Sequence, residues 1–256
     1  MLLAINCNNT NTVFAVWDEG ELRGVWRSAT DAQRTADEYV VWLDQLMALD
    51  GLRRDSIHAT IVASVVPEAH FNLERLCRHY YKSQPRFVGE PGLDIGARAL
   101  VDRPEEVGAD RLVNTVAAHD RFRAPVIVVD FGTATTFDLV DDDGNYCGGV
   151  IAPGINLSLR ALYMAAAKLP SVRIQRTDKV IGKSTIACMQ SGVFWGYVGL
   201  IEGLVERIRR EWGTPMGVVA TGGLAGLFDG ATDVIEHIDP TLTLRGLWLI
   251  HCRNQA

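Results

Sequence analysis

The sequence predicts an α/β protein built from two halves of similar plan. Two β-rich runs flank a polar turn within residues 2–17, and the same arrangement returns within residues 126–140. Each of these hairpins is followed by stretches in which apolar residues recur at helical or strand-like spacing. The chain has 256 residues, of which 48% are hydrophobic and 22% charged, so it can bury a sizeable core.

The two hairpins have polar tips of similar chemistry. Residues 2–5 and 13–17 flank NCNNTNT at residues 6–12, whereas residues 126–129 and 137–140 flank DFGTATT at residues 130–136. The two segments align without gaps. A surface β-turn would explain either hairpin alone, but two copies rich in hydroxyls and small residues favour phosphate binding, because short side chains let backbone N–H groups approach an anion closely. We expect the loops of the two halves to grip one nucleotide triphosphate.

The remaining elements follow each hairpin in order. Apolar periodicity predicts helices at residues 36–49, 71–81, 111–119, 155–167 and 190–210. Buried strands are predicted at residues 60–65 and 216–220, and the second ends in the turn TGG at residues 221–223. We place the first domain at residues 1–117 and the second at residues 118–256, although no Pro-, Gly- or Ser-rich linker marks the boundary.

Composition argues against several classes of protein. The formal net charge of -6 gives no attraction to a polyanion, so no nucleic-acid partner is expected. The apolar runs are far shorter than the roughly 20 residues that cross a bilayer, so no membrane association is expected. The five cysteines are scattered, odd in number and without a C-x-x-C pair, which argues against a disulfide framework and a zinc site. We therefore expect a cytoplasmic protein.

Seven short segments occur in a specific order along nearly the whole chain. They are NTNT at residues 9–12, GADR at 108–111, DFGTATT at 130–136, GVIAPG at 149–154, IGKST at 181–185, SG at 191–192 and TGG at 221–223. In this combination the chain resembles the type III pantothenate kinases of the actin and sugar-kinase superfamily. The resemblance implies two ribonuclease H-like domains with a cleft between them, and a homodimer.

The same resemblance implies a reaction. Type III pantothenate kinases transfer the γ-phosphoryl group of ATP to pantothenate, giving 4'-phosphopantothenate in the first step of coenzyme A biosynthesis. They use Mg²⁺ and a monovalent cation, K⁺ or NH4⁺. Asp110 is then the general base, and Asp130 holds the monovalent cation. Matching the motifs gives substrate-binding residues Gly108, Ala109, Asp110, Arg111 and Thr185, and ATP-binding residues Asn6, Asn8, Asn9, Thr10, Asn11, Thr12, Val13, Gly132 and Thr133.

Simpler structural roles remain open for the charged residues of these motifs. Asp110 precedes a predicted helix, where a carboxylate favours the helix dipole without any catalytic role. Arg111 could pair with a substrate carboxylate or with Glu105 or Glu106. Asp130 could cap the turn that follows it. Phosphoryl transfer needs a carboxylate near the attacking hydroxyl, and Asp110 suits that role without being demanded by it.

The first hairpin departs from the family pattern, which begins Asp-x-Gly-Asn-Thr. Asn6 and Asn8 stand where the family has the carboxylate and the glycine, and Val101 stands where many members have a tyrosine. Magnesium prefers anionic oxygen ligands, so we expect weaker metal handling, whereas Asn tolerates a positive φ at position 8. Three interpretations follow: a kinase impaired at its metal site, a silent paralogue that binds nucleotide or pantothenate and acts through a protein partner, or a kinase for another small hydroxy acid or alcohol.

Overall fold

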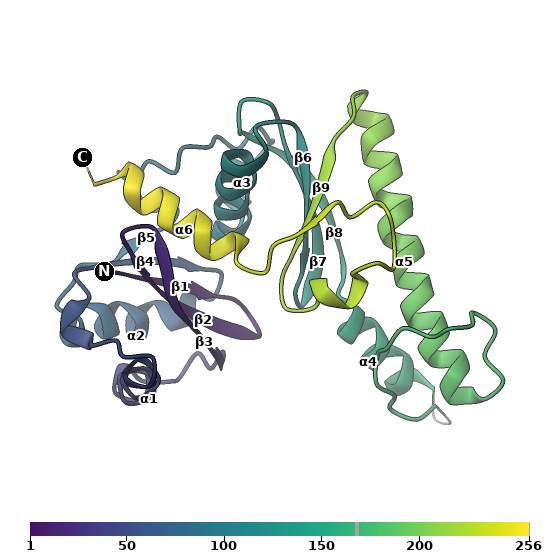
Figure 1. The fold of residues 1–256 in the computed structure, drawn as a ribbon, viewed down its shortest axis with the longest axis horizontal. Coiled ribbons are helices and arrows are strands. Elements are labelled where there is room, and N and C mark those ends of the chain that lie inside the picture. The colour runs from purple at the N-terminus through teal and green to yellow at the C-terminus, as the bar shows by residue number, and fades with distance from the viewer. Residues whose placement is uncertain (167–168, 256) are drawn as a thin grey trace. The chain divides into compact units, whose positions relative to one another are not determined.

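The computed structural model describes residues 1–166 and 169–255, which divide into two compact units (Figure 1). The first unit comprises Met1–Arg121, Gly144–Tyr146 and Thr241–Ala256, and the second comprises Phe122–Asp143 and Cys147–Pro240. This division differs from the expected one at residues 117 and 118, because the C-terminal segment returns to the first unit. There, Leu244, Leu247 and Ile250 are buried in the same cluster as Leu2 and Ala4.

The first unit contains a five-stranded sheet in the order β3-β2-β1-β4-β5. β1 pairs antiparallel with β2 and parallel with β4, while β3 pairs antiparallel with β2 and β5 parallel with β4. The strands are β1 (Leu2–Cys7), β2 (Asn11–Asp18), β3 (Glu21–Ala29), β4 (Ala59–Ser64) and β5 (Arg86–Phe87).

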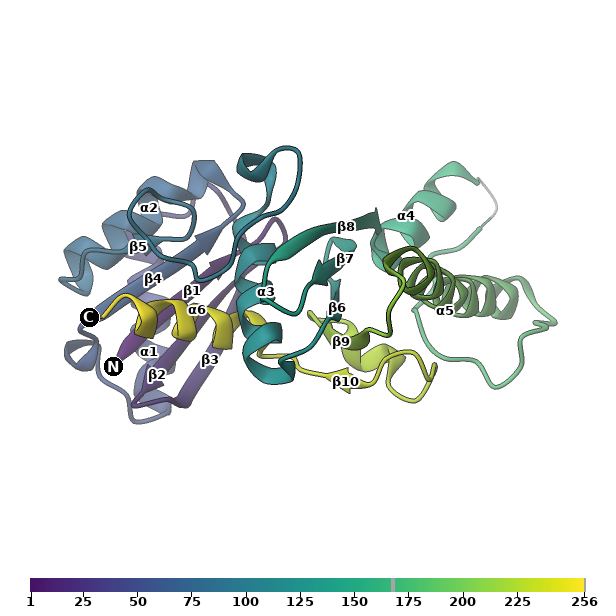
Figure 2. The same ribbon diagram turned by 90° about the horizontal axis from the view of Figure 1, so that it is seen from above.

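Helices cover both faces of this sheet (Figures 1 and 2). On one face, Leu3 and Ile5 of β1 pack with Leu43 of α1 and Leu73 of α2, and on the other Leu2 packs with α3 and α6. β1 is buried along its whole length, so its side chains alternate between two apolar layers. The helices are α1 (Ala36–Leu49), α2 (His70–Arg75) with a π turn at Leu76–Tyr80, α3 (Ala109–Phe122) and α6 (Leu242–Arg253), and short 3₁₀ turns lie at Arg54–Ser56, Pro67–Ala69 and Pro104–Glu106.

The second unit contains a five-stranded sheet in the order β10-β9-β6-β7-β8. β6 pairs antiparallel with β7 and parallel with β9. Read from β8, this order matches that of the first sheet with every strand number raised by five, so the internal repeat inferred from the hairpins extends to the whole sheet. The strands are β6 (Val126–Phe131), β7 (Ala134–Val140), β8 (Tyr146–Pro153), β9 (Gly217–Thr221) and β10 (His237–Ile238).

The 28-residue helix α5 (Thr185–Trp212) supplies most of the helical packing of the second unit. Phe194, Ile201 and Val205 of α5 share a buried cluster with Val129 and Val218 of the sheet. The helix begins at the N-cap Ser184, whose side chain accepts the Ala187 N–H, and ends at Gly213 with φ +85°. Two shorter elements, α4 (Ile155–Ala165) and the 3₁₀ turn Ala225–Phe228, complete the unit.

Most of the predicted elements are present in the structure. Strands β3, β5, β8 and β10 and helix α6 were not predicted, and α5 begins five residues earlier than expected. The helix expected at residues 155–167 ends at Ala165 with Ala166 as its C-cap, and residue 167 lies outside the described residues. In the hairpins, Asn6 pairs with Val13 whereas Asp130 pairs with Thr136, so the first tip is one residue longer and the gapless alignment is corrected.

No helix in the described part of the chain is long and apolar enough to cross a membrane.

Candidate active site

The tip of the first hairpin is exposed, while its base is buried. Beyond the last strand pair, Cys7 with Thr12, the Asn8 N–H donates to the Asn11 carbonyl oxygen at 3.0 Å. Asn9, Thr10 and Asn11 are exposed, but Thr12 is fully buried. The predicted ATP-binding residues of this loop therefore fall into an outer group that a ligand can reach and an inner group that holds the turn.

Asn6 lies on the sheet face that α3 and α6 cover. Side chains alternate along β1, so Asn6 follows Leu2 and Ala4 toward the layer that contains Val113 of α3. Asn6 is only 6% exposed, and its Oδ1 has no hydrogen-bond partner. The Oδ1 of Asn8 is likewise buried without a partner. The loop thus presents two unsatisfied oxygen acceptors, where the family pattern has a carboxylate and a glycine.

Asn8 causes no backbone strain in this hairpin. Non-glycine residues with a left-handed backbone in the described chain are Glu19, Lys82 and Arg123, so Asn8 does not adopt the positive φ that we had considered. Its counterpart Gly132 also lacks a positive φ, and a Cβ built there would meet its nearest neighbour, a backbone oxygen, at 3.5 Å, which is an ordinary contact. A side chain at this loop position is therefore compatible with the turn.

Asp110 lies in the first turn of α3 and is partly buried. Its Oδ1 accepts the Arg111 N–H at 2.9 Å, and a Cβ built on Gly108 would approach that oxygen to 2.7 Å. Burial raises the pKa of Asp110, and the Arg111 N–H and guanidinium only partly offset this effect. A carboxylate with a raised pKa is a stronger proton acceptor than an ordinary aspartate, which suits a general base.

Arg111 lies against an aromatic ring from a distant part of the chain. Its guanidinium carbon is 5.2 Å from the centre of the Tyr146 ring, a cation–π distance. Tyr146 is 2% exposed. Its N–H donates to the Arg98 carbonyl oxygen and its carbonyl oxygen accepts the Leu100 N–H, both at 2.8 Å. Of the two glutamates considered as partners of Arg111, Glu106 bonds to Arg103 at 2.7 Å.

The second hairpin is enclosed by two glycine-containing turns. Gly154 donates its N–H to the Thr133 carbonyl oxygen at 3.1 Å, and a Cβ at this position would lie 2.7 Å from the Gly132 carbonyl oxygen. Gly222 has φ +91°, and its Cβ would clash with an Asp130 carboxylate oxygen and lie 2.6 Å from the Phe131 carbonyl oxygen. Both turns can approach the loop only because they lack side chains.

Thr185 is the first residue of α5 and is exposed. It directly follows the N-cap Ser184, so it lies where the backbone N–H groups of a long helix are unpaired and attract negative charge. Asp110 and Arg111 belong to the first unit, together with Asn6, whereas Asp130, Thr133 and Thr185 belong to the second.

Similarity to known proteins extends over the whole chain. Residues 2–207 match the family described as type III pantothenate kinase. The chain belongs to the type III pantothenate kinase family. The type III pantothenate kinase of Rhodospirillum rubrum is 64% identical over 255 residues, covering 100% of this chain and 99% of that protein. That of Paramagnetospirillum magneticum is 64% identical over 256 residues, with coverages of 100% and 98%.

Solved structures confirm the predicted fold class. A structure described as a 2-dehydro-3-deoxygalactonokinase from Sinorhizobium meliloti has a TM-score of 0.64 at 14% identity, covering 100% of this chain and 97% of that chain. A structure described as a Baf family transcriptional activator from Campylobacter jejuni has a TM-score of 0.62 at 18% identity, covering 98% of each chain. At such low identity these likenesses show the fold alone. This type III pantothenate kinase family member thus has the predicted α/β fold of two ribonuclease H-like domains.

The donor atoms present fit a magnesium ion that arrives with ATP. Among the described residues, no group of three or more His, Cys, Asp or Glu side chains could hold a metal ion. Magnesium at kinase sites takes many of its oxygen ligands from phosphates and water. The Oδ1 of Asn6 has no partner but is buried, so a hydrated ion could reach it only if the side chain moved.

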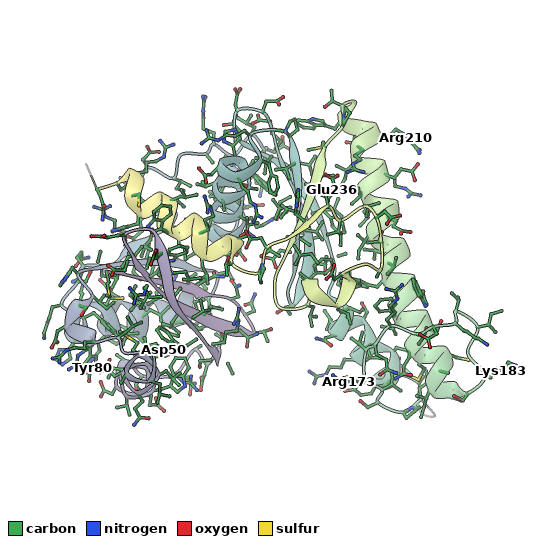
Figure 3. All side chains as sticks on the ribbon, in the orientation of Figure 1. Asp50, Tyr80, Arg173, Lys183, Arg210 and Glu236 are labelled. Atoms are coloured by element: carbon green, nitrogen blue, oxygen red, sulfur yellow. The ribbon has the colours of Figure 1, made fainter. Side chains whose placement is uncertain are left out.

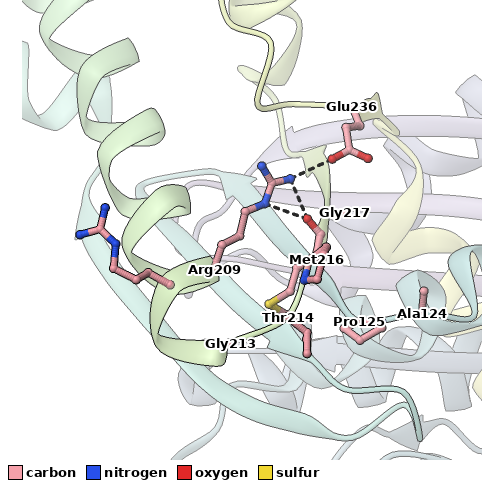
Figure 4. Close-up of a pocket in the computed structure, with 10 residues that line it drawn as sticks. Ala124, Pro125, Arg209, Gly213, Thr214, Met216, Gly217 and Glu236 are labelled. Carbon is pink, nitrogen blue, oxygen red and sulfur yellow. Dashed lines mark hydrogen bonds and ion pairs between the residues drawn. The ribbon is translucent and has the colours of Figure 1, made fainter.

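A depression of about 760 Å³ in the second unit lies away from these motifs (Figure 4). It is formed where β6 and β9 begin, whereas Asp130 and Thr221 lie where these parallel strands end. Arg209 donates to the Met216 carbonyl oxygen at 2.6 and 2.9 Å and to Glu236 at 2.9 Å. Arg210, near the end of α5 opposite to Lys183 (Figure 3), pairs with Glu206 at 2.6 Å. Both guanidinium groups are used in contacts within the second unit. The depression is not part of the candidate site.

Two residues that contact the site lie outside every recognised motif. Tyr146 lies beside Arg111, but it falls three residues before the recognised segment at 149–154 and carries no motif of its own. Thr30 bonds to the first hairpin from just beyond β3, a strand that was itself not predicted. Both contacts join residues far apart in sequence, so no local pattern signals them.

Proposed function

We propose that this protein transfers the γ-phosphoryl group of ATP to pantothenate, forming 4'-phosphopantothenate and ADP in the first step of coenzyme A biosynthesis. The observation that supports this most strongly is the 64% identity to a type III pantothenate kinase over essentially the full length of both chains. The protein is accordingly an enzyme, a kinase and a transferase.

Asp110 is the proposed general base. Its carboxylate accepts the proton of the pantothenate hydroxyl as that oxygen bonds to the γ-phosphorus, while the bond from phosphorus to the β,γ-bridging oxygen breaks and ADP leaves with the electron pair. The raised pKa of Asp110 increases its proton affinity. Its hydrogen bond from the Arg111 N–H at 2.9 Å fixes the direction of the carboxylate.

Substrate binding is assigned to the segment around Asp110 and to α5. Gly108 and Ala109 bring the backbone close to the substrate, and Arg111 pairs with the pantothenate carboxylate while its guanidinium rests on Tyr146. Thr185 adds a hydroxyl at the positive end of α5.

ATP binding is assigned to both hairpins. The exposed tips supply backbone N–H groups and side chains to the phosphates, from Asn9, Thr10 and Asn11 in one loop and from Gly132 and Thr133 in the other. The buried Thr12 and the half-buried Val13 act by fixing the shape of the first loop, and Asn6 and Asn8 add amide oxygens.

The kinase uses ATP with a divalent metal, which when bound neutralises phosphate charge. We propose Mg²⁺ for this role and K⁺ or NH4⁺ at Asp130, whose carboxylate the Gly222 turn approaches closely. Exchanging K⁺ for Na⁺ should lower the rate, and insensitivity to this exchange would remove the monovalent-cation role from Asp130.

The working form is proposed to be a cytoplasmic homodimer that associates with neither nucleic acid nor membrane. All five cysteines are free thiols, as a reducing compartment maintains them. Large exposed apolar side chains gather in one stretch of the second unit, where a second copy would cover them: Ile151, Leu157, Leu162, Met164, Val180, Ile181 and Ile186. Light scattering should give a mass of two chains for the wild type, and the Ile181→Asp variant should give a mass closer to that of one chain.

A silent paralogue is the second candidate function, and the absence of the first-loop carboxylate at Asn6 favours it. A coupled assay with ATP, Mg²⁺, K⁺ and pantothenate decides between the two. We expect phosphopantothenate from the wild type, formation slower by about a hundredfold or more in Asp110→Asn, and wild-type rates from Asp102→Asn, an exposed matched control. Nucleotide or pantothenate binding without turnover by the wild type would instead support the paralogue. If another small hydroxy acid or alcohol is turned over faster than pantothenate, that compound is the substrate.

A further inference from the structure

Thr30 contacts the first hairpin at three points, although it belongs to none of the recognised motifs. Its N–H donates to the Thr10 carbonyl oxygen at 2.9 Å, and its hydroxyl donates to the Asn8 carbonyl oxygen at 2.6 Å. The same hydroxyl oxygen is 2.9 Å from Thr12 Oγ1. Thr30 directly follows β3, so the outer strand of the hairpin sheet holds the loop from outside.

The direction of these hydrogen bonds follows from counting protons. Each threonine hydroxyl has one hydrogen. The Thr30 hydrogen is used on the Asn8 carbonyl oxygen, so the hydrogen between the two hydroxyls comes from Thr12. The alternative acceptor of Thr12, the Cys7 sulfur at 3.4 Å, is weaker and would leave two oxygens facing each other without a hydrogen. The result is a directed chain from Thr12 to Thr30 to the Asn8 carbonyl oxygen.

The loop is held from outside the hairpin as well as from within it. Four residues, 8–11, lie beyond the last strand pair, and loops of this length are commonly built around a type I turn, which needs no positive φ. The described non-glycine residues with positive φ do not include Asn9 or Thr10. Within the loop the Asn8 N–H donates to the Asn11 carbonyl oxygen at 3.0 Å, and Thr30 adds bonds from outside at Asn8 and Thr10.

We propose that Thr30 is a positioning residue for ATP: its hydroxyl fixes the Asn8 carbonyl and so sets the direction of the backbone N–H groups at the loop tip. The inference rests on the proposed role of this loop in binding ATP. Thr30 itself acts through the loop and need not touch the nucleotide. Loss of the hydroxyl therefore raises the KM for ATP and leaves the KM for pantothenate unchanged.

Three variants of the full-length protein test the proposal. Thr30→Val keeps the shape and removes the hydroxyl, and should lower kcat/KM for ATP about tenfold, or about 1.4 kcal/mol. Thr30→Ser keeps the hydroxyl and should stay within about twofold of the wild type. Thr60→Val is the matched control, because Thr60 is buried in the same sheet and its hydroxyl is 3.0 Å from that of Ser83, but it lies at the opposite end of β4 from the loop.

The outcomes separate this inference from the proposed function. A wild-type KM for ATP in Thr30→Val, an equal loss in Thr60→Val, or no rescue by Thr30→Ser would overturn the positioning role. If Thr30→Val does not fold, Thr30→Ala must show the same selective effect, and its failure to do so counts against the proposal. If the wild type makes no phosphopantothenate, the proposed function fails. In that case, calorimetric titration shows whether Thr30→Val weakens the affinity for a non-hydrolysable ATP analogue and leaves the affinity for pantothenate unchanged.

Discussion

Replacing Asn6 with aspartate restores the carboxylate of the family pattern at a position that is only 6% exposed. The amide oxygen there has no hydrogen-bond partner. In the absence of metal, the new carboxylate would be buried without compensation, so the Asn6→Asp variant should be less stable than the wild type. With Mg²⁺ and ATP present, the same charge should become favourable.

The size of this effect follows from the environment of Asn6. The wild-type amide oxygen is already unpaired, so the variant adds only the cost of burying a charge. Taken as about 2 kcal/mol, this cost lowers the Tm of a chain of this length by roughly 4–8 °C. Burial raises the pKa of the new carboxyl, so its folded form holds a proton more tightly than the unfolded chain does. The destabilisation should therefore be absent near pH 4 and should grow as the pH rises through the folded pKa.

Thermal denaturation at pH 4 and pH 8, with and without Mg²⁺ and ATP, measures the effect. Asn9→Asp, at the exposed tip of the same loop, is the control for stability alone. At limiting Mg²⁺ we expect Asn6→Asp to increase turnover on the order of tenfold to a hundredfold. A variant as stable as the wild type at pH 8 without metal, and no more active with it, would refute the assignment of Asn6 to the metal and phosphate position.

Three further predictions concern other residues of the site. Asp110→Asn should lower kcat by about a hundredfold or more. Its Tm at pH 8 should equal or exceed that of the wild type, because the amide still accepts the Arg111 N–H and the charge that burial opposes is removed. This gain in stability should vanish below the unfolded pKa of about 3.9. In the wild type, the acidic limb of kcat/KM should lie above that value, and a limb at or below it would contradict the raised pKa. Gly222→Ala should cost about 2–5 kcal/mol of unfolding free energy, from its left-handed backbone and its clash with Asp130. Gly223→Ala, whose Cβ meets no atom within 4 Å, should leave Tm unchanged, and equal effects of the two substitutions would refute this packing argument.

The core strands and their hairpins were predictable from sequence because their signals are local. β1, β6 and β9 are continuous apolar runs, and α1 begins with a capping box in which Thr35 and Glu38 bond to each other's backbone N–H. The missed strands β3 and β8 are edge strands whose strand signals are weak. Both contain glycine, β3 also carries charged residues, and β8 ends in proline. Helix α6 contains Gly246, which suggests a break in sequence. In the structure, the missing side chain lets α6 approach the backbone of Val113 in α3.

The chemistry of the site was predictable only where a motif names it. Asp110 and Asp130 were found through their motifs, and Asn6 through its departure from one. The support of the first loop by Thr30 and the closeness of Gly222 to Asp130 are contacts across 22 and 92 residues that depend on strand order. The burial that raises the pKa of Asp110 likewise arises from packing that no short segment reveals.

In the proposed mechanism, Asp110 takes the proton from the pantothenate hydroxyl during phosphoryl transfer. A crystal structure with pantothenate, Mg²⁺ and a non-hydrolysable ATP analogue tests this most directly. We predict an Asp110 carboxylate oxygen within about 2.6–3.2 Å of that hydroxyl, with the γ-phosphate on its far side. A pantothenate hydroxyl bound out of reach of Asp110, with another group in hydrogen-bond contact, would contradict the account.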